Sequence, residues 1–94
     1  MKTLTNKKTE IEGFNDSKMT YADLAKICIN VMPQGGLDVT EMIARLKVTN
    51  KLEDKTKIEL EDAEAETLKA CVTSMKWTMM HQDLVDFIQE VEKL

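Results

Sequence analysis

Few side chains in this sequence have the type and spacing that catalysis requires. The only histidine, His81, has no serine or cysteine beside it in a recognisable catalytic motif, so we expect a helix cap or a surface residue. The two cysteines, Cys28 and Cys71, lie far apart among apolar neighbours at helical spacing, outside any Cys-x-x-Cys pair. We therefore expect two buried, reduced thiols; a single disulfide is the alternative.

Two further groups of residues resemble ligand sites but have simpler explanations. The acidic cluster at Glu59, Glu61, Asp62, Glu64 and Glu66 lacks the turn and the terminal glutamate of a calcium loop. Acids are favoured at the positive end of a helix, which explains the cluster without a metal. The Gly35-Gly36 pair does not match a phosphate-binding loop and predicts a turn between helices. We expect that the protein is not an enzyme and that it binds neither a cofactor nor a metal ion.

The charge distribution disfavours nucleic acid and membranes. The 94-residue chain has a formal net charge of −4. Residues 1–57 carry ten basic and eight acidic side chains, whereas residues 58–94 carry three and nine. An acidic half repels phosphates, and the single arginine, Arg45, leaves little for reading bases. With no apolar signal segment or membrane span, the sequence predicts a cytoplasmic protein.

Caps and apolar periodicity place four helices in a chain short enough for one domain. We expect a polar, mobile tail over residues 1–17, unless Ile11 and Phe14 dock on the body, and a helical domain over residues 18–94. Helices are expected from Thr20, from Asp38, from about Glu61 and from about Gln82. The predicted fold class is all-α or nearly so: a bundle of about four short helices, with room for one short extended segment near 56–60.

The segment 38–52 carries two opposed apolar stripes. Val39, Met42, Ile43 and Leu46 form one stripe, and Val48 and Leu52 fall almost opposite. We expect one continuous helix that is buried on two sides. The alternative is a helix-turn-helix with its turn at Lys47-Val48, which would make the chain a small DNA-binding transcriptional regulator.

The last helix carries the longest regular apolar stripe in the chain. We expect it either to form an association surface or to pack on the other helices as a lid. The connection before it is unusually apolar, and its tryptophan is either an interface residue or a plug of the core. The candidate interface residues are Trp77, Met79, Met80, Leu84, Phe87, Ile88, Val91 and Leu94.

Part of the chain resembles small bacteriophage and prophage-type helical proteins. The resemblance rests on the run from Gly35 to Val48, on Ile58–Glu64, on Leu68-Lys69 and on Lys76-Trp77. It implies a viral accessory role, either in structural assembly or in binding a host factor, and supplies no catalytic residues. Together with the stripes, it predicts a non-enzymatic protein that interacts with a protein partner or with itself through an apolar helix face.

Overall fold

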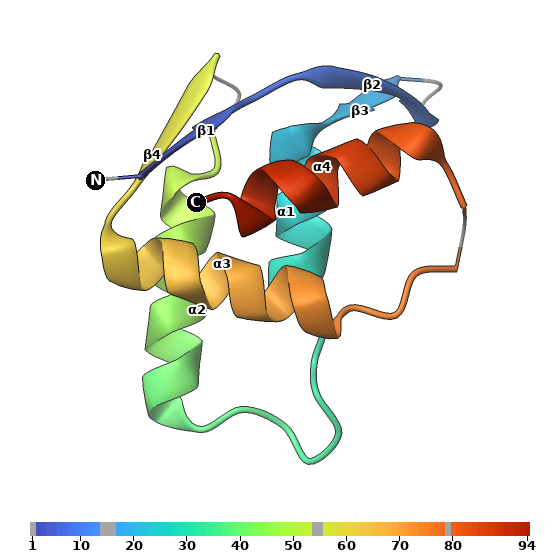
Figure 1. Ribbon diagram of the computed structural model, residues 1–94. Helices are drawn as coiled ribbons and strands as arrows, with labels where there is room; N and C mark the ends of the chain where they lie inside the picture. Colours follow the sequence, from blue (N-terminus) through green and yellow to red (C-terminus); the bar gives the residue numbers. More distant parts are fainter. Residues whose placement is uncertain (1, 14–16, 54–55, 79) are drawn as a thin grey trace.

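The computed structural model describes residues 2–13, 17–53, 56–78 and 80–94. Over these residues the fold combines four helices with two small antiparallel sheets (Figure 1). The elements follow in the order β1 (Lys2–Thr5), β2 (Lys8–Glu12), β3 (Lys18–Thr20), α1 (Tyr21–Asn30), α2 (Val39–Lys51), β4 (Lys57–Leu60), α3 (Asp62–Ser74) and α4 (Gln82–Glu92). The all-α prediction is therefore wrong, and the fold class is α+β.

The strands account for the error, and two of them, β1 and β2, lie within residues 1–17, where a polar tail was expected. β1 pairs with β4, so that Leu4 lies opposite Ile58, and β2 pairs with β3. In β2 and β4 the side chains alternate between buried and exposed, as in a sheet with one face on the core, whereas β1 buries only Leu4. Leu4 and Ile11 are buried by this pairing, whereas Phe14 lies outside the described residues. The extended segment expected near 56–60 is β4.

The four helices begin where their caps predict. Thr20 caps α1 in a capping box: its hydroxyl accepts from the Asp23 amide, and its own amide donates to the Asp23 carboxylate. The Asp38 carboxylate accepts from the Glu41 amide, 2.7 Å away, at the start of α2. Glu61 opens α3, as an acid at a helix N-terminus should. Local sequence thus sets the helix starts, whereas the strand pairings depend on distant segments.

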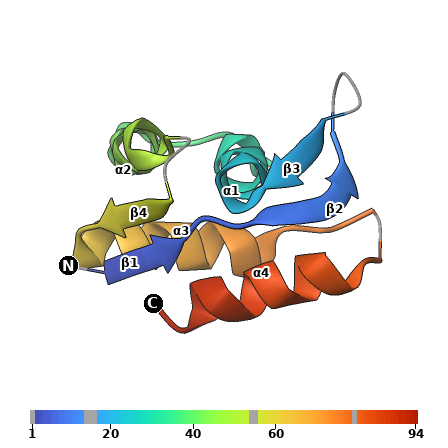
Figure 2. The same ribbon diagram turned by 90° about the horizontal axis from the view of Figure 1, so that it is seen from above.

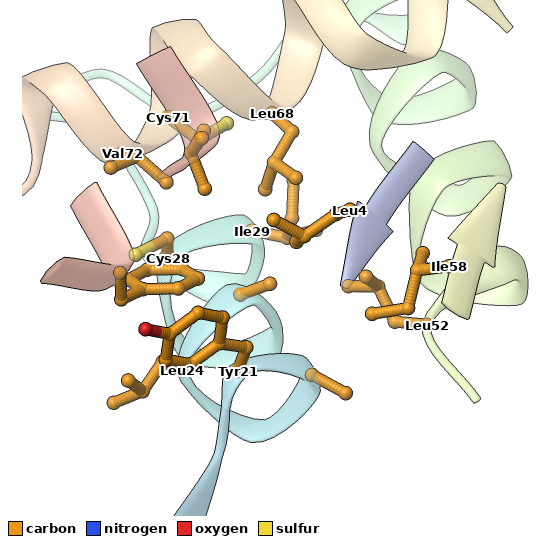
Figure 3. Close-up of a cluster of buried hydrophobic side chains, with 14 of the residues drawn as sticks. Leu4, Tyr21, Leu24, Cys28, Ile29, Leu52, Ile58, Leu68, Cys71 and Val72 are labelled. Atoms are coloured by element: carbon orange, nitrogen blue, oxygen red, sulfur yellow. The ribbon is translucent and has the colours of Figure 1, made fainter. Parts of the chain in front are cut away.

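The helices form three layers, with α3 as the middle layer. Viewed from above, α1 and α2 form one layer, α3 lies in the middle, and α4 covers the opposite side (Figure 2). The core between them contains Leu4, Leu52, Ile58 and Leu68 (Figure 3). α2 and α4 therefore lie on different sides of the molecule, and each has its own solvent-facing surface.

Candidate functional site

The apolar stripe of α4 faces the interior of this chain. Phe87 is at the centre of the packing: its ring meets that of Tyr21 edge-to-face, with the ring centroids 5.2 Å apart. The remaining residues of the stripe are buried or packed against the core: Leu84, Val91, Ile88 and Leu94. The structure therefore places the last helix as the lid, the second of the two arrangements that the sequence left open.

Of the described side chains in the connection between α3 and α4, some pack against the core and others lie in solvent. Trp77 is half-buried and packs against the core, in the position of a plug. Met80 is 98% exposed, and Met79 lies outside the described residues. The predicted interface residues thus form no continuous exposed surface in the described part of the chain.

A different helix presents its apolar face to solvent. Four side chains of α2, each between 44% and 71% exposed, line up at i, i+3, i+4 and i+7: Val39, Met42, Ile43 and Leu46. The opposite stripe, Val48 and Leu52, is buried. The prediction that this helix is buried on two sides is therefore wrong, because only one side is covered. We call the four exposed side chains the α2 face.

Arg45 fixes the rotation of α2 about its axis. Its guanidinium Nη1 donates to the carbonyl oxygens of Ile29, 3.1 Å away, and Val31, 2.7 Å away. These carbonyls lie at the end of α1, where helical carbonyls lack partners within the helix. The Nε atom of Arg45 pairs with Glu41 at 3.2 Å. The single arginine is thus a structural clamp between α1 and α2, and it turns the α2 face toward solvent.

A shallow groove runs beside the α2 face. It has a volume of about 220 Å³ and lies where α2 meets α3. Small side chains, Ala44 and Ala63, contribute to its floor, while Lys47 and Glu64 supply opposite charges. The α2 face and this groove together offer a ridge and a furrow of the kind that helices use to pack on one another.

Helix α2 contains no turn of a helix-turn-helix. The helix runs unbroken from Val39 to Lys51, through the segment Lys47–Thr49 where the turn was required. Residues 38–52 are therefore one continuous helix, as the first of the two interpretations predicted.

The two cysteines are buried and free, as predicted. They come from α1 and α3, which face each other in the core (Figure 3). Burial raises the pKa of the Cys28 thiol to about 12, and the neighbouring Cys71 adds to this effect. Burial also raises the pKa of Cys71. Thiols held in the protonated form are poor nucleophiles, so neither cysteine is suited to catalysis.

The other candidate residues have structural roles. His81 caps α4: its Nδ1 accepts from the Asp83 amide at 3.0 Å, in agreement with the cap interpretation. Gly35 and Gly36 both have positive φ angles, which a turn explains. In the described part of the chain, no three histidine, cysteine or acidic side chains are placed to hold a metal ion.

Comparisons with known proteins give no match: neither a family model, nor a curated protein, nor a solved structure is significantly similar to this chain. The resemblance to phage-type proteins therefore stays a prediction. None of the described helices has the length and hydrophobicity needed to cross a bilayer. The α2 face remains the strongest candidate site, and the sequence had assigned it to the core.

Proposed function

We propose that this chain is a non-enzymatic interaction protein that associates through the α2 face, and that the partner is the α2 face of a second copy. The observation that carries the proposal is the exposure of four large apolar side chains on one side of a single helix. Scattered exposed hydrophobic residues are normal, but a contiguous stripe of them is typical of an interaction surface.

The pattern of α2 suits an antiparallel pairing with itself. The stripe is symmetric about the midpoint between Met42 and Ile43, so a two-fold axis there places Val39 beside Leu46 of the second copy. The ends of the helix carry opposite charges, because Asp38 caps the N-terminus whereas Lys47 lies near the C-terminus. In an antiparallel pair, the acidic end of each helix lies at the level of the basic end of the other, and like charges are kept apart.

The energetics allow a dimer and limit its strength. Complete burial of a side chain of this size contributes about 1.5–3 kcal/mol, and the four residues are each roughly half exposed. Two copies together would therefore gain roughly 6–12 kcal/mol, against an association cost of about 4–15 kcal/mol. The largest gain less the smallest cost leaves about 8 kcal/mol, so the tightest Kd that these ranges allow is about micromolar.

Sedimentation equilibrium over roughly micromolar to millimolar protein tests the proposal. The wild-type chain should show a reversible monomer–dimer equilibrium. Met42→Glu should abolish the dimer, because it places two carboxylates near the two-fold axis in an apolar contact. Val85→Glu is the matched control: Val85 is a similarly exposed apolar residue of α4, on the other side of α3, and its replacement should leave the dimer unchanged.

Two results would contradict the proposal. A wild-type chain that stays monomeric at the highest concentration would exclude the second copy as the occupant, and a heterologous protein partner would then replace it. A dimer that Met42→Glu leaves intact and Val85→Glu disrupts would place the interface on α4. Circular dichroism of each variant shows whether its helices are retained.

A further inference from the structure

A polar pocket lies on the side of the molecule opposite α2. It has a volume of about 270 Å³ and is formed by α4, the start of α1, the start of β2 and the residue before β2. Three carboxylates of α4 line it at i, i+3 and i+7, and therefore on one side of the helix: Asp83, Asp86 and Glu90. The other lining residues are Lys7, Lys8, Thr9, Tyr21 and Gln89.

Tyr21 brings an unpaired hydroxyl to this pocket. The residue, labelled in Figure 3, is only 4% exposed. Its ring packs on that of Phe87. Its hydroxyl forms no hydrogen bond with any described residue, and it reaches solvent, because no buried side-chain oxygen of the described residues lacks a partner. Burial raises the pKa of Tyr21, and the charges of Asp86, Glu90 and Asp83 raise it further. Because Tyr21 lines the same pocket as these carboxylates, its phenol oxygen is available to a ligand bound there.

The carboxylates keep capacity to accept further hydrogen bonds. Asp83 Oδ2 accepts from the Glu10 amide at 2.8 Å, and Asp86 Oδ1 accepts from Gln82 Nε2 at 3.0 Å. Glu90 Oε1 lies 3.6 Å from the Lys93 ammonium, an exposed pair of little strength. Each of these contacts occupies one oxygen of a group that accepts about four hydrogen bonds. Lys7 and Lys8, both exposed, line the pocket but form no ion pair with these acids.

We propose that this pocket binds a guanidinium group, with the Tyr21 hydroxyl and the carboxylates of Asp86 and Glu90 as its acceptors. A guanidinium has five donors in one plane and is weakly hydrated, so it suits a half-buried set of several oxygens. The three carboxylates and two lysines give the pocket a net charge of −1, which favours a single cation. Because α4 and α2 lie on opposite sides of α3 (Figure 2), this site is independent of the α2 face.

The single tyrosine of the chain gives a direct probe. The full-length protein is labelled with 3-fluorotyrosine and titrated with N-acetylarginine amide at low salt, while the ¹⁹F shift is recorded. The expected result is a saturable shift. N-acetylcitrulline amide, which has a similar shape but no charge, should give none. Titration with free arginine shows whether the guanidinium belongs to a free amino acid or to a peptide. If free arginine binds more tightly than N-acetylarginine amide, the ligand is a free amino acid, whose carboxylate Lys7 and Lys8 would contact. If free arginine binds more weakly, the ligand is an arginine of a peptide.

Variants test whether the ligand binds in the pocket or is only attracted by the overall negative charge of α4. Asp86→Asn combined with Glu90→Gln should weaken binding at least tenfold, whereas Glu92→Gln, at an exposed acid outside the pocket, should change it less than twofold. Lys8→Ala should strengthen binding of the amide. The absence of a saturable shift, an equal shift with the citrulline compound, or equal losses in the pocket and Glu92 variants would each overturn the proposal. None of these results depends on dimer formation by α2.

Discussion

Two leucines of α2 provide a matched pair that tests how this helix is oriented. Leu52, at the C-terminal cap of the helix, is 1% exposed and packs in the core, whereas Leu46, one and a half turns earlier, is 56% exposed on the α2 face. The change from leucine to alanine removes the same atoms at both positions. The difference in cost therefore reports the environment of each side chain and not its chemistry.

The structure predicts a large difference between the two variants. Leu52→Ala should lower the free energy of unfolding by about 2.7–5 kcal/mol, because it removes buried methyl groups and leaves a cavity. Leu46→Ala should lower it by less than about 1 kcal/mol, because the side chain is largely in water and alanine favours helix slightly. The expected separation of about 2–5 kcal/mol is well above the error of a denaturation experiment.

Urea denaturation, followed by the fluorescence of Trp77, measures both values. The experiment requires low micromolar protein, so that association through the α2 face does not contribute to the stability of the wild-type chain. Equal losses for the two variants, or a larger loss for Leu46→Ala, would refute the orientation of α2 and with it the exposure of the α2 face.

The remaining predictions follow from individual residues. Arg45→Met should cost about 2–4 kcal/mol in urea denaturation, since two charged hydrogen bonds to the end of α1 are lost, whereas Glu41→Gln should cost less than about 1 kcal/mol. His81→Ala should lower the thermal midpoint by removing the cap of α4, a loss of about 0.5–2 kcal/mol, and His81→Asn should restore most of it. Because the pKa of Cys28 is raised to about 12 in the folded chain, stability should fall as pH rises from about 9 toward 12, where only the unfolded chain loses this proton. In the Cys28→Ala variant, stability should fall less over the same pH range. In the native protein, Cys28 and Cys71 should react slowly with a thiol reagent at pH 8, and rapid labelling would contradict their burial.

The helices were predictable because their signals are local. Thr20 and Asp38 are N-caps in the sequence and in the structure, since a cap involves only the next three residues. Among the strands, only β4 gave a local signal, which predicted the extended segment near 56–60. Its partner β1 lies more than fifty residues away, and the four residues of β1 show no clear alternation of apolar and polar side chains.

Periodicity identifies the apolar faces of a helix but cannot say which face is covered. α2 has two such faces, and the choice between them depends on Arg45 reaching the end of α1 and on Leu52 meeting Ile58 and Leu4 in the core (Figure 3). These are tertiary contacts, and no short-range pattern encodes them. The pocket around Tyr21 was missed for the same reason, because it joins α4 to residues more than sixty positions earlier.

An intermolecular contact between Val39 and Leu46 tests the central claim most directly. Within one helix these residues are seven positions apart, or about 10 Å along the axis, too far for their methyl groups to meet. In the antiparallel pair, Val39 of one copy lies beside Leu46 of the other. A sample that mixes isotope-labelled and unlabelled protein should therefore show nuclear Overhauser effects between these methyl groups across the two copies. If the protein associates and no such effect is seen, or if no association occurs at millimolar concentration, the α2 face is not the self-association surface.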